Sequence, residues 1–248
     1  MSMTGAGFSL IINDTKNETK MKKAIIVTLA LTGILAGMPS FAESVSAPLT
    51  ASASVTAGDA IMAKIEKANS TMKTVQCKFH QVRTIKASGK KNMADGNLYF
   101  NVDGRLAMRF TAPEGEYIIS SGSKFYVHRG PKNAVFDITK NATVANMSGT
   151  LIGCVKGNPA EVAKRSDYKI EVAENAEGYV VTLTTDNAAR RGYSKIVLTY
   201  RKSDCILVKM VMDEPSGIST TYEMSDIKKN ASFPDSVFVV PARQGSAK

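Results

Sequence analysis

The chain has 248 residues and a formal net charge of +10, with 44% hydrophobic and 22% charged residues. This length, without internal repeats, is enough for one domain with a substantial core. The positive charge is dispersed, because no run of lysine and arginine exceeds two residues and none is interleaved with aromatic residues on a predicted helix. We therefore expect a solvated basic surface and no nucleic-acid partner.

Residues 21–42 have the pattern of a signal peptide. The segment begins Met21-Lys22-Lys23, continues with an apolar run over 24–38 and ends in the small-x-small site Ser40-Phe41-Ala42. The apolar run is about 15 residues long, against the roughly 20 that a stable membrane-spanning helix needs. We expect cleavage before Glu43 and a soluble, exported mature protein, a retained N-terminal anchor being the alternative.

Composition divides the rest of the chain into an upstream extension, a leader, a folded domain and a tail. The leader is rich in Ser, Ala and Thr and is predicted to be flexible. The four parts cover residues 1–20, 43–56, 57–242 and 243–248, in that order.

The folded domain is predicted to open with an amphipathic helix and a strand. From Gly58 onwards, apolar residues at helical spacing indicate about four turns, and these residues are Ile61, Ile65, Ala68 and Met72. Further on, Val75, Cys77 and Phe79 alternate with polar residues, which is the pattern of a strand with one polar face.

The stretch from Gly96 to Ile138 is predicted to be a meander of about five antiparallel strands. Turn sequences such as Asp-Gly and Ser-Gly-Ser separate its pieces, because Gly and Asp tolerate the positive φ of tight hairpins. Large apolar side chains occupy alternate positions: Leu98, Phe100, Leu106, Met108, Phe110, Phe125 and Val127. One face of this sheet must be covered by something apolar, either the protein's own core or a guest.

A second apolar helix is predicted over 142–155. Its apolar residues fall at helical spacings and are Val144, Met147, Leu151, Ile152 and Val155. Gly149 and Gly153 interrupt it at about 1 kcal/mol each relative to alanine, so the helix should be weakly held. Pro159 opens a further short helical turn over 160–165, since its missing N–H costs nothing at a first helical position.

The β pattern returns beyond this helical region. Six further strands are predicted, over 168–172, 179–184, 194–200, 206–212, 219–224 and 237–240. Because a long antiparallel sheet curls and tends to close or half close, we predict a mainly β fold with helices (α+β). The sheet would be an unclosed half-barrel of about 11 strands.

The sequence does not indicate catalysis or metal binding. Both histidines, His80 and His128, fall on the polar phases of strands, and the chain has no G-x-S-x-G, C-x-x-C or H-E-x-x-H pattern. We expect no enzyme activity, metal or cofactor, since a lipid-modifying enzyme would need a serine and a carboxylate beside one histidine. Cys77, Cys154 and Cys205 lie in apolar runs, which favours buried thiols over one disulfide with one thiol left over.

A series of short motifs follows the predicted strands. They are Phe79-x-Gln81, Gly96-x-Leu98-Tyr99, Leu106-x-Met108-Arg109-Phe110-x-x-Pro113, Ile118-x-Ser120-x-Gly122-x-x-Phe125-Tyr126, Asp213, Gly217-x-x-Thr220-x-Tyr222, Asn230, Phe238 and Pro241. In this order, behind a predicted signal peptide, they resemble the periplasmic outer-membrane lipoprotein carrier (LolA-like) family. The resemblance spans about Ala57 to Pro241.

The resemblance implies a half-barrel that covers an apolar cavity, with helices as a lid. The cavity would be lined by Leu98, Phe100, Leu106, Met108, Phe110, Phe125, Val127, Met210 and Tyr222, and the lid would present Val144, Met147, Leu151, Ile152 and Val155. The cargo would be the acyl chains of lipoproteins. A monomeric periplasmic carrier would receive them from an inner-membrane lipoprotein-releasing transporter and pass them to an outer-membrane acceptor.

The chain departs from the family pattern before the third strand. Family members commonly have a basic residue and a proline there, and the arginine helps to hold the lid, whereas this chain has Val102-Asp103. We expect a different latch, with Arg105 or Arg109 as its substitute. Related half-barrels also bind other lipids or sense lipoproteins, so an interaction module of the same fold without a transport role is the alternative function.

Overall fold

The computed structural model of the chain describes residues 56–186 and 192–241. The predicted upstream extension, signal peptide and tail, and all of the leader except Thr56, lie outside the described residues. No helix in the described part of the chain combines the length and the apolar character needed to cross a membrane.

The strands form one antiparallel sheet of 11 strands in the order β6-β5-β4-β3-β2-β1-β11-β10-β9-β8-β7. The edge strands β6 and β7 do not pair with each other, so the sheet is unclosed, and the predicted half-barrel is confirmed. The bounds are β1 Thr74–Ile85, β2 Lys90–Asn101, β3 Arg105–Ala112, β4 Glu114–Ser121, β5 Lys124–Arg129, β6 Lys132–Asp137, β7 Lys169–Glu174, β8 Tyr179–Thr184, β9 Lys195–Tyr200, β10 Leu207–Asp213 and β11 Ile218–Lys229.

The sheet is strongly curved. Three strands separate β5 from β1, so on a flat sheet these two strands would lie about 19 Å apart at roughly 4.8 Å per strand. Arg129 Nη1 on β5 nevertheless donates a hydrogen bond to Gln81 Oε1 on β1 over 3.1 Å. The two side chains therefore meet across a concave face.

The pairing register aligns side chains in rows across this concave face. Phe100 lies opposite Leu106, and Leu106 lies opposite Ser120. The next row consists of Leu98, Met108, Ile118 and Val127. Because successive side chains of a strand point to opposite faces, the residues at alternate positions form one continuous apolar wall.

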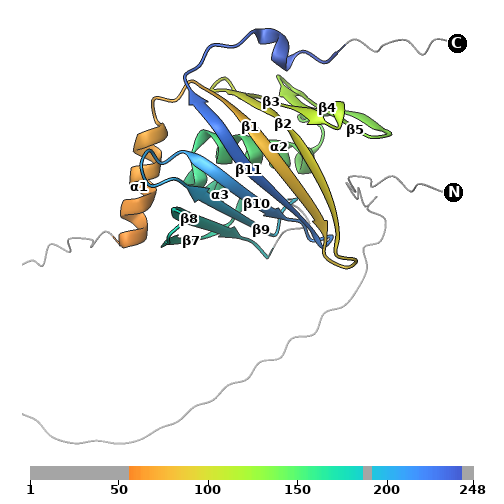
Figure 1. The fold of residues 1–248 in the computed structure, drawn as a ribbon. Coiled ribbons are helices and arrows are strands. Elements are labelled where there is room, and N and C mark those ends of the chain that lie inside the picture. The colour runs from red at the N-terminus through yellow and green to blue at the C-terminus, as the bar shows by residue number, and fades with distance from the viewer. Residues whose placement is uncertain (1–55, 187–191, 242–248) are drawn as a thin grey trace, which may run out of the picture. The chain divides into compact units, whose positions relative to one another are not determined.

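Three α-helices accompany the sheet, namely α1 (Ala57–Asn69), α2 (Ala142–Lys156) and α3 (Pro159–Ser166). Thr56 begins α1 with a capping box, and Asn141 begins α2 by accepting a hydrogen bond from the Val144 N–H over 3.0 Å. Gly157 ends α2 with a φ of 75°, a left-handed conformation that glycine adopts without strain. Figure 1 shows α2 and α3 behind the long strands β1 and β11.

The predicted last strand, over 237–240, is wrong. The 3₁₀ helix η1 (Asp235–Phe238) ends within this segment, which contains no strand. The Arg109 side chain on β3 donates hydrogen bonds of 2.8, 3.1 and 2.6 Å to the carbonyls of Val237, Ser236 and Val239. A side chain thus satisfies the backbone acceptors that a neighbouring strand would otherwise satisfy.

The segment around η1 covers the convex face of the sheet. Phe238 is 4% exposed and packs with Ala107, Tyr117 and Ile119 in a second apolar cluster. The ring of Phe233 lies 5.3 Å from that of Tyr99 and 5.9 Å from that of Phe238, both edge to face. The sheet is therefore covered on both faces in this region, by α2 inside and by the chain's last described residues outside.

The cysteines are buried free thiols, as predicted: Cys77, Cys154 and Cys205. Burial raises the pKa of Cys77 and of Cys154 to about 12. These two thiols are therefore protonated at neutral pH and behave as small apolar side chains.

Candidate functional site

The structure places the nine predicted cavity residues on the concave wall, in one apolar cluster. Eight of them are buried: Leu98, Phe100, Leu106, Met108, Phe110, Val127, Met210 and Tyr222. Phe125 is partly buried and packs against them. The strand register explains this arrangement, because Met210 lies opposite Tyr222 and Phe125 lies opposite Ser120 in rows that continue across the sheet.

The apolar face of α2 lies on this wall. Leu151 and Val155 belong to the same buried cluster as the wall residues, and Ile152 packs against it. Val144 and Met147 are buried as well. The concave face is thus covered by the chain's own helix in this structure.

A buried side-chain hydrogen bond joins α2 to the sheet. Ser148 Oγ on α2 lies 2.9 Å from Ser120 Oγ on β4, and both side chains are buried. A neutral hydroxyl pair of this kind contributes about 1 kcal/mol. The docking of α2 therefore depends mainly on apolar contact.

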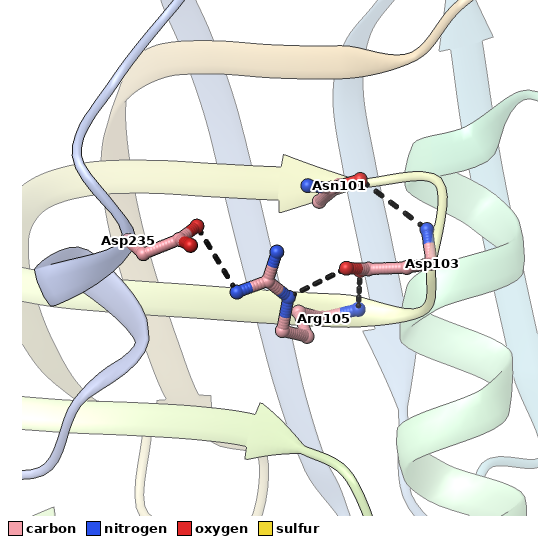
Figure 2. A network of polar contacts seen from close by, with 4 residues as sticks. All are labelled: Asn101, Asp103, Arg105 and Asp235. Atoms are coloured by element: carbon pink, nitrogen blue, oxygen red, sulfur yellow. Dashed lines mark hydrogen bonds and ion pairs between the residues drawn. The ribbon is translucent and has the colours of Figure 1, made fainter.

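The expectation that Arg105 or Arg109 latches the lid is wrong. Both side chains belong to the convex face, because they alternate along β3 with Leu106, Met108 and Phe110. Arg105 donates to Asp103 over 2.7 Å and to Asp235 over 3.1 Å, as Figure 2 shows. These arginines hold the C-terminal segment, whereas α2 lies across the other face.

The glycines of α2 have a packing role in addition to their expected cost in helix stability. A Cβ atom at Gly153 would collide with Val162 of α3, and one at Gly149 would lie 2.9 Å from Arg165 Nη1. Both positions face α3. The absence of side chains there lets α2 and α3 pack closely as one helical unit.

A series of hydrogen-bonded polar side chains crosses the concave face beyond the apolar rows, and the sequence analysis did not predict it. Gln81 Nε2 donates to the Tyr222 hydroxyl over 2.9 Å, and Arg129 Nη1 donates to Gln81 Oε1. Gln81 is 2% exposed, so this chain of hydrogen bonds lies inside the half-barrel. Gln81 and Arg83 share the strand phase of Phe79, and this break in apolar alternation was the signal in the sequence.

In addition to Gln81, two groups fix Arg129 in place, namely Glu116 and the ring of Phe110. Arg129 Nε forms an ion pair with Glu116 Oε2, while Glu116 Oε1 accepts a hydrogen bond from the Gly130 N–H over 2.6 Å. Its guanidinium carbon lies 3.8 Å from the centroid of the Phe110 ring, a cation–π distance. Arg129 therefore joins the apolar wall to the charged end of the concave face.

Three more ionisable side chains lie close to this chain of hydrogen bonds. Burial and the charge of Arg83 lower the pKa of Lys132, and burial raises the pKa of Glu214. Lys132 begins β6, Arg83 lies on β1, and Glu214 lies in the turn before β11. Their charges interact because the curvature of the sheet brings the edge strand β6 near β1.

The histidines lie on the opposite face, away from this cluster. His80 Nδ1 is 2.7 Å from Asp95 Oδ1, in a surface pocket of about 230 Å³ that Ser225 and Thr111 also line. Among the described residues, neither hydroxyl forms a hydrogen bond with His80. The ring of His128 lies 5.4 Å from that of Tyr117. The described part of the chain also holds no group of three or more His, Cys, Asp or Glu side chains placed to bind a metal ion.

Several solved structures are similar to this chain at low sequence identity. No curated protein matches the chain. Similar solved structures include a LolA superfamily protein from Nitrosomonas europaea (14% identity, 73% of this chain, 97% of that chain, TM-score 0.37). A second is an outer membrane lipoprotein-sorting protein domain from Vibrio parahaemolyticus (12% identity, 72% of this chain, 94% of that chain, TM-score 0.39). A third is the lipoprotein LppX from Mycobacterium tuberculosis (12% identity, 71% of this chain, 97% of that chain, TM-score 0.38).

The family match covers most of the described domain. Residues 70–241 match the family described as outer membrane lipoprotein carrier protein LolA. This range contains all 11 strands of the sheet together with α2, α3 and η1. The chain is therefore a member of the LolA family of outer membrane lipoprotein carrier proteins.

Proposed function

We propose that this protein is a periplasmic carrier that shields the acyl chains of lipoproteins between the inner and the outer membrane. The observation that carries the proposal is the apolar concave wall, which α2 covers with an apolar face that includes Leu151 and Val155. Cargo would displace α2 from the wall and would then lie between the wall and the apolar face of the helix. Membership of a family of carrier proteins supports this assignment.

The physical need for such a carrier follows from the cost of exposing lipid to water. At about 0.8 kcal/mol per methylene, one acyl chain of ordinary length costs on the order of 10 kcal/mol to expose. A carrier must also release its cargo. If α2 returns to the wall as cargo leaves, the affinity is a difference between two burials and stays moderate.

The residues assigned to cargo binding are those that share the wall. The cavity would be lined by Leu98, Phe100, Leu106, Met108, Phe110, Phe125, Val127, Met210 and Tyr222. The lid would contribute Val144, Met147, Leu151, Ile152 and Val155. The donor would be a lipoprotein-releasing transporter of the inner membrane, and the acceptor a protein of the outer membrane.

A sensing or interaction module without a transport role is the second candidate. The burial of Leu151 and Val155 favours it, because a helix that stays on the wall permanently would leave no room for an acyl chain. The two candidates differ in whether α2 leaves the wall.

Substitution of Leu151 by Glu separates the two. With a mobile lid, Leu151→Glu should leave the fold largely intact and abolish cargo uptake, because the charged helix no longer forms the apolar cover of a bound chain. With a permanent lid, the buried charge should unfold or strongly destabilise the domain. Thr143→Glu, at an exposed position of the same helix, is the matched control.

The readout is lipid content and thermal unfolding of the protein purified from an exporting host. Solvent extraction should recover acylated protein or lipid from the unsubstituted protein and from Thr143→Glu. An unsubstituted protein that neither co-purifies with nor accepts any acylated molecule is not a carrier.

A further inference from the structure

The two edges of the sheet differ in how they are protected against pairing with another strand. Three of the six residues of β7 are charged, namely Lys169, Glu171 and Glu174. The first turn of α1 lies beside this strand, because a Cβ atom at Gly58 would be 3.4 Å from Val172 Cβ. Charged side chains and a covering helix are common means by which an edge strand avoids a new partner.

The edge formed by β6 has no such charges along its middle. The four central residues of the strand, 133–136, are Asn-Ala-Val-Phe, and the strand pairs with β5 in one continuous register without a bulge. Val135 is 58% exposed. A regular, uncharged edge of this kind is a template for a further strand.

One printed bond fixes which backbone groups of β6 face outwards. The Ile138 N–H donates to the Ser123 carbonyl over 2.9 Å, and these two residues continue the β5–β6 register by one pair. Hydrogen-bonded and non-hydrogen-bonded pairs alternate in an antiparallel ladder. Asn133 and Val135 therefore each direct an N–H and a C=O away from β5, and in the described residues neither forms a further backbone hydrogen bond.

The apolar wall extends to this edge. Val127 of the wall lies opposite Ala134 of β6, and Phe125 lies opposite Phe136, which packs against the same apolar cluster. The polypeptide of an acylated protein is covalently joined to the acyl chain, so it has to leave the wall at one of its borders. At β6 this border offers alternating donors and acceptors, which match the spacing of an extended polypeptide.

We propose that the edge of β6 pairs with the extended polypeptide segment next to the acylated residue of a cargo lipoprotein. The segment would add a strand to the sheet through hydrogen bonds with the backbone groups of Asn133 and Val135. The inference rests on the proposed function, because it assumes that the wall receives the acyl chain of the same molecule. Main-chain pairing would let one carrier accept lipoproteins of different sequence.

Three ligands with the same acyl chain test the proposal. They are lauroyl-glycinamide, a lauroyl hexapeptide of alternating serine and threonine, and the ester analogue of this lipopeptide, in which oxygen replaces each N–H between the residues. Calorimetric titration of the lipid-free protein, below the micelle concentrations of the ligands, gives the three affinities. The first ligand reports the acyl chain, and the third has the length of the peptide without its donors.

The lipopeptide should bind roughly tenfold more tightly than lauroyl-glycinamide, and the ester analogue should lose most of this gain. Val135→Pro should lose it as well, because proline has no N–H and the ladder with β5 does not use the N–H at this position. Val135→Thr retains the N–H and should keep the full gain. Both variants should bind lauroyl-glycinamide as the unsubstituted protein does. If Val135→Pro does not fold, the ester analogue decides alone.

The possible failures contradict different claims. Equal affinity for the lipopeptide and lauroyl-glycinamide, or a gain that the ester analogue or Val135→Pro retains in full, would refute pairing with cargo while the carrier function stands. A dimer in analytical ultracentrifugation that Val135→Pro abolishes, without any gain for the lipopeptide, would assign the edge to a second copy of the chain instead. Absence of binding for all three ligands would refute the proposed function itself.

Discussion

The two faces of the sheet are covered by segments that are held in different ways. On the concave face, α2 is held by apolar contacts and the Ser120–Ser148 hydroxyl pair. On the convex face, Arg109 donates three hydrogen bonds to the C-terminal segment, and Arg105 adds an ion pair with Asp235. The guanidinium of Arg105 also lies 4.6 Å from the centroid of the Phe238 ring.

This difference indicates which cover can be exchanged. Charged hydrogen bonds to backbone carbonyls are directional and are lost as a set when the segment leaves, whereas apolar contacts can be replaced by any apolar surface of similar area. An acyl chain offers such a surface and no donors. We therefore expect the concave cover to be exchangeable and the convex cover to be a fixed part of the fold.

The largest effect is expected from Phe238→Ala. Removing a buried aromatic side chain should lower the free energy of unfolding by about 4 kcal/mol, because a cavity remains beside Tyr117 and Ile119. Val239→Ala, at a side chain that is 61% exposed, should change it little. Chemical denaturation measures both variants, and equal stabilities would mean that the convex cover is not part of the cooperative fold.

Arg109→Ala should have the second largest effect and should lower the free energy of unfolding by about 2 kcal/mol. Three carbonyls lose a charged donor, and water can replace it only in part. Lipid uptake should be unchanged, because the site of change is on the convex face. Arg109→Lys should be intermediate, as an ammonium keeps the charge without the planar fork. A variant that is fully stable but loses lipid binding would reverse the assignment of the two faces.

Ser148→Ala should weaken the docking of α2 by about 1 kcal/mol, because the buried Ser120 hydroxyl loses its partner. Amide hydrogen exchange in α2 should accelerate about fivefold relative to the strands, and lipid uptake should rise. The double variant Ser120→Ala/Ser148→Ala removes both hydroxyls and should recover part of the loss. Unchanged exchange in Ser148→Ala would mean that this pair does not hold the lid.

The apolar wall and its helix could be predicted from sequence because both depend on local periods. Residues at alternate positions share a sheet face, so Leu106, Met108 and Phe110 had to lie together, and Leu151 with Val155 had to form a helical stripe. Register then aligned the neighbouring strands without further information.

The charged end and the C-terminal segment depend on contacts between distant strands. Gln81 and Arg129 meet only because the sheet curves, and no local pattern records that curvature. The residues over 237–240 look like a strand because they are apolar, but Arg109, more than 120 positions earlier, supplies their hydrogen-bond donors. Local sequence patterns therefore predict the type of an element more reliably than they predict which distant element it contacts.

The smallest effect concerns the connection between the wall and the lid. Asp137 ends β6 just before α2, and Thr139 donates to its Oδ1 from both the hydroxyl (2.6 Å) and the N–H (3.0 Å). Lys124 donates to its Oδ2 over 2.9 Å. These hydrogen bonds lower the pKa of Asp137 from 3.8 to about 2, and the bond from the Thr139 hydroxyl has the largest effect.

Since the pKa is lower in the folded state, this carboxylate stabilises the fold fully above the unfolded-state value of 3.8, and the contribution is lost as pH falls towards 2. The side chain is partly exposed to solvent, so the effect should be small. NMR titration of its carboxyl carbon should give the lowered pKa, and Asp137→Asn should make stability less dependent on pH over this window. A pKa near the ordinary value of 3.8 would mean that Asp137 does not hold the turn before α2. The lid would then be joined to its wall more loosely than the convex cover is joined to the sheet.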